Sequence, residues 1–149
     1  MEIERKYLIN RESLPDNLYT YPSHIIEQGY LCTEPVVRIR KEDDNYYLTY
    51  KSSGLLSREE YNLPLTSSGY AHLLPKCDGN IISKTRFLIP YDRYTIELDV
   101  FSGRFENLIL AEVEFCSTDE AERFIPPQWF GKDVTFSTDY QNSTLSRMP

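Results

Sequence analysis

Apolar and polar residues alternate along much of this chain, in short segments separated by turns. Because the side chains of residues i and i+2 of a β-strand point to the same face, this alternation predicts strands with one apolar and one polar face. The turns are rich in Gly, Pro, Asn and Asp, and Glu42-Asp43-Asp44-Asn45 is typical of a β-hairpin. Eight strands are predicted, at residues 2–9, 25–31, 36–40, 46–52, 58–65, 81–89, 93–101 and 108–115.

Helical signals are few and short. Four short helical segments are predicted, at residues 10–14, 67–74, 117–124 and 139–146. The third begins with Ser117 and Glu120, which have the spacing of a capping box. Turns are expected at 78–80 and 90–92, and Gly29 within its strand predicts a bulge. Together these elements predict a mainly β (α+β) fold, with a single antiparallel sheet that can close on itself and a few flanking helices.

The polar faces of the strands carry charged residues in same-sign pairs two positions apart. The basic pairs are Arg38 with Arg40 and Lys84 with Arg86, and the acidic pairs are Glu2 with Glu4, Glu97 with Asp99, and Glu112 with Glu114. Neighbouring like charges destabilise a sheet unless opposite charge lies between them. An ordinary solvated face over an apolar core is the alternative, but such a face mixes both signs, whereas this chain separates them by strand. We therefore expect the charged faces to line a water-filled tunnel, with helices covering the apolar faces.

Two sets of inward-facing charges would define the chemistry of such a tunnel. The basic set, suited to a small polyanion with several phosphates, comprises Lys6, Arg38, Arg40, Lys51, Lys84 and Arg86. The acidic set, whose oxygens suit Mg²⁺ or Mn²⁺, comprises Glu2, Glu4, Glu97, Asp99, Glu112 and Glu114. Divalent metal that joins carboxylates to a polyphosphate is typical of phosphoryl transfer.

Composition narrows the range of partners. With 149 residues, 40% of them hydrophobic, we expect one globular domain over residues 1–149. The net charge of −7 argues against general binding to nucleic acid or anionic membranes, and no apolar run reaches the roughly 20 residues that span a bilayer. The first residues form a charged strand pattern and not a signal peptide, so a cytoplasmic location is expected. Three cysteines without metal-ligand spacing and only two histidines disfavour thiolate and imidazole metal sites.

The charged motifs resemble those of the CYTH superfamily, the triphosphate tunnel metalloenzymes. Glu2-Ile3-Glu4-Arg5-Lys6 matches the N-terminal ExExK signature, and further matches follow in the family's order. They are Val37-Arg38-Ile39-Arg40, Leu48-Thr49-Tyr50-Lys51, Arg58-Glu59-Glu60, Lys84-Thr85-Arg86, Glu97-Leu98-Asp99, Glu112-Val113-Glu114, and Gly131-Lys132-Asp133-Val134-Thr135 with Tyr140 and Asn142. The resemblance covers the whole chain, and it implies an eight-stranded antiparallel β-tunnel that acts on triphosphates with divalent metal.

The resemblance also implies roles for individual residues. The basic set and Arg58 would bind the triphosphate, although Arg58 and Glu60 match a buried charged pair that could instead orient the basic wall. The acidic set would bind metal, with three leading candidates: Glu2, Glu4 and Glu114. Many family members have a second glutamate where Asn62 stands, so no metal is assigned to that strand, and many have glutamate in place of Asp133.

Three residues are expected to act in catalysis by the same resemblance. They are Lys6, Glu4 and Tyr30. Lys6 pairs with a tyrosine after a Gln-Gly sequence in some short bacterial members, and Gln28-Gly29-Tyr30 matches that pattern. Simple packing is the alternative role for this tyrosine.

The small size most resembles the short bacterial inorganic triphosphatases. This resemblance implies hydrolysis of tripolyphosphate to pyrophosphate and phosphate by a monomer or homodimer, with a small-molecule substrate and no nucleic-acid or membrane partner. The nearest alternatives are a nucleoside or thiamine triphosphatase. An adenylyl cyclase would need a purine pocket, which is not recognisable, and a non-catalytic polyphosphate or nucleotide-binding module would not need so many metal-binding carboxylates.

Overall fold

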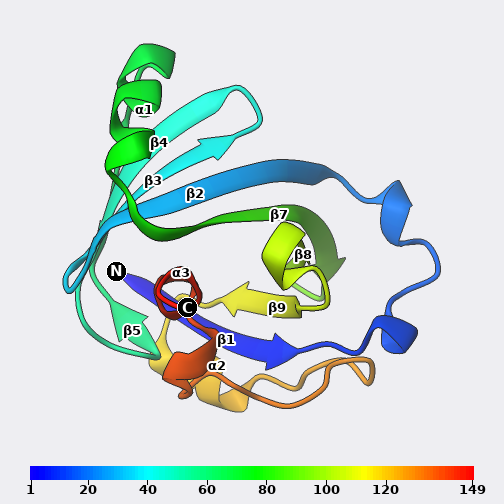
Figure 1. Cartoon of the computed structure of the whole chain (residues 1–149). Helices are drawn as coiled ribbons and strands as arrows, with labels where there is room; N and C mark the ends of the chain where they lie inside the picture. The colour runs from blue at the N-terminus through cyan, green and yellow to red at the C-terminus, as the bar shows by residue number, and fades with distance from the viewer.

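The chain folds into one antiparallel sheet that curls into a nearly closed tunnel (Figure 1). The structure is a computed structural model that describes residues 1–149. Its strands are β1 (Glu2–Leu8), β2 (Ser23–Thr33), β3 (Val36–Glu42), β4 (Asn45–Lys51), β5 (Ser57–Arg58), β6 (Glu60–Pro64), β7 (Asp78–Tyr91), β8 (Tyr94–Ser102) and β9 (Ile109–Glu114). The predicted mainly β tunnel is confirmed, with nine strands in place of eight.

The extra strand arises where the tunnel closes. The strand order is β5-β1-β9-β8-β7-β2-β3-β4-β6, so β5 lies at one edge beside β1 and β6 lies at the other edge beside β4. The prediction of one strand over 58–65 was wrong, because this segment changes its pairing partner at Glu59. The change brings the two edges of the sheet together through a single stretch of chain.

The helices are short and lie outside or at one end of the tunnel. They are α1 (Ser67–Leu73), α2 (Thr118–Arg123) and α3 (Asn142–Ser146), with 3-10 turns at Arg11–Ser13, Leu18–Thr20, Leu74–Lys76, Gly103–Phe105 and Thr138–Tyr140. The hydroxyl of Ser117 accepts the backbone N–H of Glu120 at 3.2 Å, while the Glu120 carboxylate accepts the N–H of Cys116 at 3.3 Å. None of the helices has the length and apolar character needed to cross a membrane.

Strand β7 begins earlier than expected. The turn predicted at 78–80 is instead the start of this strand, because Gly79 and Asn80 contact the C-terminal residues. Gly79 has a φ of +68°, and a Cβ there would lie 2.0 Å from the carbonyl oxygen of Ser146. The Asn80 amide donates to the carbonyl oxygens of Leu145 (3.1 Å) and Met148 (2.8 Å). These contacts hold α3 against β7.

Two local irregularities of the sheet have clear causes. Pairing of β2 with β7 shifts register between Gln28 and Tyr30, which confirms the predicted bulge at Gly29. The turn predicted at 90–92 also begins late, because β7 continues through Tyr91 and the chain reverses at Asp92, whose φ is +54°.

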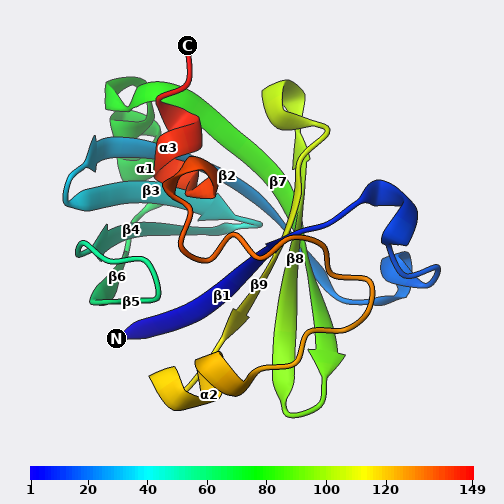
Figure 2. The same ribbon diagram turned by 90° about the horizontal axis from the view of Figure 1, so that it is seen from below.

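The apolar core lies outside the tunnel wall. Thirteen buried hydrophobic residues form its main cluster, and Tyr7, Leu98 and Ala111 within it adjoin charged residues of the opposite strand face. Ala121 and Phe124 bring α2 and the chain after it onto this cluster. Figure 2 shows α2 and α3 on opposite sides of β1. The main apolar cluster therefore packs on the outer face of the sheet. A second cluster of five buried residues, including Ile82, Phe101 and Leu110, shares the strand faces of Lys84, Asp99 and Glu112, so the inner face is polar only along part of its length.

Candidate functional site

The tunnel contains a polar cavity of about 330 Å³. Of its 22 lining residues only three are hydrophobic, namely Tyr30, Val36 and Tyr47. Thirteen of the fourteen residues predicted for the site line it: Glu2, Glu4, Lys6, Tyr30, Arg38, Arg40, Lys51, Arg58, Lys84, Arg86, Glu97, Glu112 and Glu114. The exception is Asp99. The inward orientation inferred from the alternating pattern is what the structure has.

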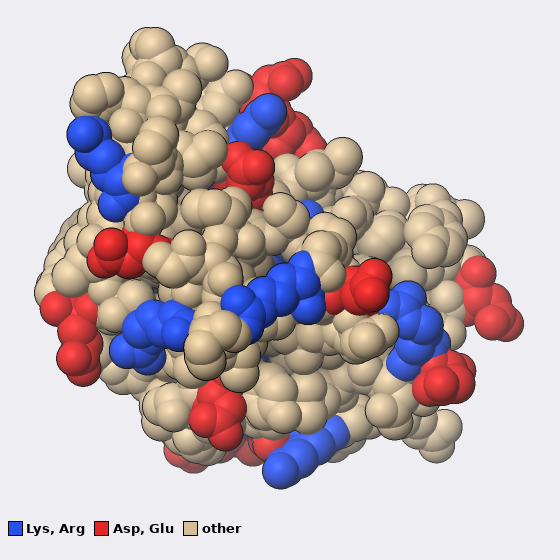
Figure 3. All heavy atoms as spheres, viewed as in Figure 1, with Lys and Arg blue, Asp and Glu red and all other residues tan.

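The two signs of charge occupy different walls of the cavity. Glu4, Glu97, Glu112 and Glu114 come from β1, β8 and β9, which are neighbours in the sheet, and Glu112 pairs directly with Lys6 and with Glu97 across the strands. The arginines and lysines come mostly from β3, β4 and β7. The outer face in Figure 3 differs, because there blue and red residues are interspersed among uncharged ones. In the interior, acidic residues predominate on one set of neighbouring strands and basic residues on another, and the two sets meet where Arg86 lies 3.2 Å from Glu97 and Lys6 lies 3.8 Å from Glu112.

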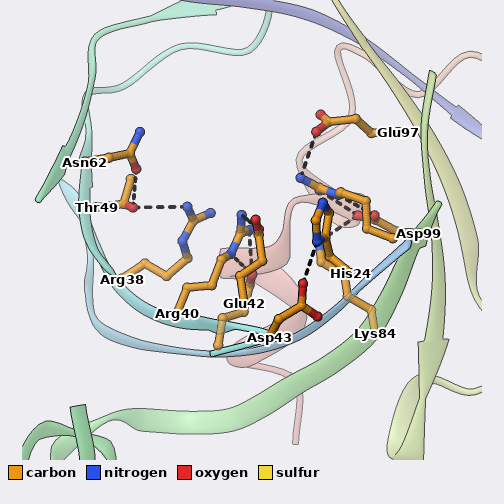
Figure 4. A network of polar contacts seen from close by, with 12 residues as sticks. His24, Arg38, Arg40, Glu42, Asp43, Thr49, Asn62, Lys84, Glu97 and Asp99 are labelled. Atoms are coloured by element: carbon orange, nitrogen blue, oxygen red, sulfur yellow. Dashed lines mark hydrogen bonds and ion pairs between the residues drawn. The ribbon is translucent and has the colours of Figure 1, made fainter. Parts of the chain in front are cut away.

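The basic wall is organised by hydrogen bonds to uncharged side chains. Arg38 donates to the hydroxyl of Thr49 at 3.2 Å, and that hydroxyl donates to Asn62 at 2.6 Å. Arg40 donates through Nε and Nη2 to the amide oxygen of Gln28, at 2.9 and 2.6 Å. Figure 4 shows Arg38 and Arg40 extending from one wall and Lys84 from the other into the space between them. Neutral partners fix these guanidinium groups without cancelling their charge.

Like charge remains uncompensated on the basic wall. Burial and the neighbouring Arg38 and Arg86 lower the pKa of Arg40 to about 9. Burial, partly opposed by Asp99 and reinforced by Arg86 and Arg40, lowers the pKa of Lys84 to about 7. The Nε–H of Arg38 is buried and has no hydrogen-bond partner. Crowded cations with a free donor form a site for an anion.

Asp99 lies behind this wall and holds two of its cations. It is completely buried, and Lys84 Nζ donates to Oδ2 at 2.7 Å while Arg86 Nε donates to Oδ1 at 2.7 Å. Burial acts to raise the pKa of Asp99, but Arg86 and Lys84 outweigh it and hold that pKa below its ordinary value. Both of its oxygens therefore accept hydrogen bonds from cations, and neither faces the cavity.

On the acidic wall, several carboxylates are buried close to one another. Burial and the nearby carboxylates of Glu112 and Glu2 raise the pKa of Glu4 well above its ordinary value. Burial raises the pKa values of Glu97 and Glu114 as well, and other carboxylates add to this. For Glu112, burial is outweighed by three cations, Lys6, Arg86 and Lys84, which hold its pKa well below the usual range. Glu112 is thus the carboxylate of this wall that the cations stabilise most, while Glu4, Glu97 and Glu114 bind protons more tightly than free carboxylates do.

At one end of the tunnel four charges form a closed cluster. Lys51 Nζ lies 3.0 Å from Glu2 and 3.3 Å from Glu60, and Arg58 Nε lies 3.5 Å from Glu2. Burial and the hydrogen bond with Glu60 raise the pKa of Glu2 to about 7. Burial acts to raise the pKa of Glu60, but the hydrogen bond with Glu2 and the charge of Lys51 outweigh it and lower this pKa to about 2. Glu2 therefore binds a proton more tightly than Glu60 does.

Lys6 and Tyr30 both line the cavity but contact different groups. Lys6 Nζ donates to the carbonyl oxygen of Tyr140 at 3.3 Å and lies 3.8 Å from Glu112. Burial acts to lower the pKa of Lys6, yet the carboxylates of Glu112 and Glu4 raise it, so this lysine stays protonated. The hydroxyl of Tyr30 accepts the amide of Gln28 at 3.1 Å. The pairing of Lys6 with Tyr30 stays a prediction.

Several lining residues were not predicted. Thr49 and Tyr47 share the strand face of Lys51, and Glu42 shares that of Arg40, so the period of two contains the signal for them. Gln141, Asn142 and Ser143 line the cavity because the C-terminal segment returns to the tunnel, and the Asn142 amide oxygen accepts from Lys84 and from Gln28, each at 3.2 Å. The polar pattern of that segment does not indicate this return; the only signal was that Asn142 matches the closing motif of the family.

The donor set of the acidic wall fits a hard divalent ion. Glu2, Glu4, Glu97, Glu112 and Glu114 offer only carboxylate oxygens, which Mg²⁺ and Mn²⁺ prefer. Burial and neighbouring carboxylates raise the pKa values of Glu4 and Glu114, and a bound cation would favour their ionised forms. No three Asp, Glu, His or Cys side chains converge closely enough to enclose an ion by themselves. Such a wall suits an ion that keeps water and phosphate oxygens among its ligands.

Comparison with known proteins gives consistent matches over the full length. A family model described as CYTH domain matches residues 1–149. An inorganic triphosphatase from Nitrosomonas europaea is 41% identical, covering 97% of this chain and 96% of that protein. An inorganic triphosphatase from Acetivibrio thermocellus is 31% identical, covering 99% of this chain and 94% of that protein.

Solved structures agree with the architecture. A crystal structure of an inorganic triphosphatase matches with a TM-score of 0.74 at 35% identity, covering 100% of this chain and 96% of that one. A putative adenylate cyclase from Bacillus halodurans matches with a TM-score of 0.65 at 18% identity, covering 100% of this chain and 92% of that one. The second likeness, at this identity, concerns the fold alone.

Proposed function

Because this chain belongs to the CYTH domain family, we propose that it hydrolyses inorganic tripolyphosphate to pyrophosphate and phosphate with the help of Mg²⁺ or Mn²⁺. Two relatives at 41% and 31% identity are inorganic triphosphatases, which supports a triphosphate as the substrate. The monomer or homodimer state and the cytoplasmic location stay predictions from the sequence.

One observation carries the proposal: a single cavity has a basic wall and an acidic wall, each crowded with like charge. Burial and neighbouring like charges together lower the pKa values of Arg40 and Lys84 and raise the pKa of Glu4. A bound polyanion would reduce the repulsion between the cations of the basic wall, and a divalent cation would reduce the repulsion between the carboxylates of the acidic wall. Only a ligand that combines both, such as a metal-bound polyphosphate, relieves the two together.

The basic residues would bind the phosphate chain along its length. Arg38 has a free buried Nε–H, and Arg40 donates two hydrogen bonds to the neutral amide of Gln28, with Glu42 as a more distant counter-charge at 3.9 Å. Lys84 and Arg86 are positioned from behind by Asp99. We therefore assign Asp99 to orienting the two cations, and leave metal binding to the carboxylates that line the cavity. Lys51 and Arg58 would contact substrate once Glu2 engages a metal ion.

The acidic wall and Lys6 would serve the reaction itself. When bound, a divalent ion at Glu2, Glu4 and Glu114 would neutralise phosphate charge and supply a water of lowered pKa. Glu4 lines the cavity beside these carboxylates, and we assign it the second role of accepting a proton from that water. Lys6 stays protonated and can stabilise charge on the departing phosphate oxygen. Water adds to the terminal phosphorus, the phosphoanhydride bond breaks, and pyrophosphate leaves.

The cavity favours an inorganic substrate over a nucleotide or thiamine triphosphate. Its three hydrophobic lining residues offer little surface for a purine or a thiazolium ring, which proteins bind mainly through apolar and aromatic contacts. The absence of an apolar subsite also disfavours a cyclase. A polyphosphate-binding module without activity is the outcome that kinetics must separate from an enzyme.

Phosphate release tests this proposal. Tripolyphosphate, ATP and thiamine triphosphate are each incubated with Mg²⁺, with Mn²⁺ or with EDTA. We expect tripolyphosphate to be hydrolysed fastest, and only with metal. Glu114→Gln should reduce this rate by about 100-fold or more, because it removes a carboxylate of the acidic wall, while the exposed Glu106→Gln serves as the matched control. Binding without turnover under every metal condition would refute an enzymatic role.

A further inference from the structure

A second cavity continues from one end of the tunnel. It has a volume of about 340 Å³, and it lies where the β2–β3 turn, the loop after β4 and the C-terminal segment meet. It shares five lining residues with the tunnel cavity: Val36, Lys51, Arg58, Gln141 and Ser143. We call it the end groove. The end groove therefore adjoins the space assigned to the substrate.

The lining of the end groove is chemically suited to anionic oxygens. Six Ser and Thr hydroxyls contribute to it, together with three cations, Lys51, Arg58 and Arg147. Glu34 is its single acidic residue. Hydroxyl and guanidinium donors are the groups that bind phosphate in proteins. Lys51 and Arg58 face both cavities and are held by Glu2, so they can bridge an anion that extends from one cavity into the other.

The groove is poorly suited to the other groups that a triphosphate can carry. None of its lining residues is aromatic, so a nucleobase or a thiamine ring would find no stacking partner there. Its apolar contribution comes from the small side chains of Val36, Leu55 and Pro35. The groove therefore favours further phosphate units over a heterocycle.

We propose that the end groove binds the fourth and later phosphates of linear polyphosphates longer than tripolyphosphate, while the tunnel holds the first three. This inference rests on the proposed function, since it extends the same bound chain. Arg147 is the cation that belongs to the groove alone, and its side chain is exposed near the Thr144 hydroxyl at 3.5 Å. Polyphosphate length would then be distinguished by a few groove residues outside the tunnel.

A set of charge variants tests the groove. Arg147→Gln should raise the KM for tetrapolyphosphate (or its inhibition constant, if it is not cleaved) about threefold, the effect of one exposed charge. Glu34→Gln should lower the same constant for tetrapolyphosphate by about twofold, because it removes the negative charge of the groove, which repels phosphate. Both should leave the KM for tripolyphosphate within about twofold. Lys132→Gln, which alters an exposed lysine outside both cavities, is the matched control, and thermal unfolding checks that each variant is folded.

The outcomes separate this inference from the proposed function. Equal changes for tripolyphosphate and tetrapolyphosphate in Arg147→Gln would show a general field effect and overturn the groove site. A larger change for ATP than for tetrapolyphosphate would place a nucleoside in the groove and would also overturn it. If wild type cleaves no triphosphate, the proposed function fails, but tetrapolyphosphate binding measured by calorimetry still decides the role of Arg147.

Discussion

A single buried carboxylate determines the geometry of the basic wall. Asp99 has no exposed surface, and it accepts hydrogen bonds from both Lys84 and Arg86, with a second bond from Arg86 Nη2 at 2.9 Å. Without it, two buried cations would face each other with less counter-charge. Because a buried pair that loses one partner leaves an uncompensated charge, the effect on folding is expected to be large.

Asp99→Asn should lower the free energy of unfolding by roughly 3 kcal/mol, since it leaves Lys84 and Arg86 without their shared anion. Urea denaturation measures this loss. Asp119→Asn is the control, because Asp119 pairs with Arg123 at 3.9 Å on the surface and should contribute less than about 1 kcal/mol. If excess Mg²⁺ restored full activity to Asp99→Asn without restoring stability, Asp99 would be a metal ligand and our assignment would be incorrect.

For single residues, the alternation of polar and apolar positions along each strand predicted which side chains face the tunnel. It placed eleven of the lining residues on the inner face, because strand side chains alternate between the two faces, while Tyr30 and Arg58 were predicted from the family resemblance. It could not distinguish Asp99 from Glu97, since both lie on one face and the burial of Asp99 against Lys84 and Arg86 arises only in the folded structure. Gln28, which fixes Arg40, carries no charge and so gave no signal.

Among the elements, β1 depends on a partner that is not a regular strand. Residues 131–135 run beside it, with hydrogen bonds from the N–H of Leu8 to Lys132 and from the N–H of Val134 to Lys6, each at 2.8 Å. Asp133 fixes this segment, because its carboxylate accepts from Arg5 and from the hydroxyl of Thr135. We call residues 131–135, held in place by Asp133, the clamp. The clamp positions β1, the strand that carries Glu4 and Lys6.

The clamp should depend on pH through Asp133. Although burial opposes it, hydrogen bonds from Thr135 and Arg5 lower the pKa of Asp133, so the ionised form stabilises the folded state. That contribution is complete above the unfolded pKa of about 3.9 and is lost as the pH falls through the lower folded value. Asp133→Asn should therefore be less stable than wild type near neutral pH by roughly 0.5–1 kcal/mol, a range suited to a partly exposed pair.

Thermal unfolding across this pH range measures the difference between the two proteins. The stability difference between wild type and Asp133→Asn should become smaller as the pH falls below about 4. Asp139→Asn, which removes an exposed carboxylate that makes no side-chain hydrogen bond or ion pair, should follow wild type throughout. A difference that stays constant from neutral to acid pH would show that Asp133 acts by packing alone.

Element types were more predictable than element partners. Strand alternation, Pro residues and the Ser117 capping box placed nearly all elements within a few residues. The division at Glu59 was missed because alternation continues through it while the pairing partner changes. The early start of β7 was missed because Gly79 and Asn80 are typical of turns, and only contact with α3 makes them part of a strand.

Across the whole molecule, packing and charge are separated in space. The main apolar cluster lies on the outer face of the sheet, and the inner face carries most of the buried charge. Two walls of like charge raise the free energy of the empty tunnel, because burial limits the screening of each charge by water. A ligand that fills the tunnel should thus stabilise the entire fold.

Tripolyphosphate added without metal, so that no turnover occurs, should raise the midpoint of thermal unfolding. At about 100 times its dissociation constant, binding contributes roughly 2.7 kcal/mol, which corresponds to roughly 5–10 °C for a chain of this size. Differential scanning fluorimetry measures the shift, with sodium chloride at equal ionic strength as the control. An equal shift in both solutions would mean that general screening, and not occupation of the tunnel, accounts for it.

The closure through β5 and β6 leaves one strand edge unpaired. β6 bonds only to β4, and its outward residues Tyr61 and Leu63 are exposed. Such an edge could template addition of another chain and so seed aggregation. Here it is five residues long and ends at Pro64, which has no N–H to donate. The segment that forms β5 and β6 therefore brings the two edges of the sheet together and also limits self-association at the free edge of β6.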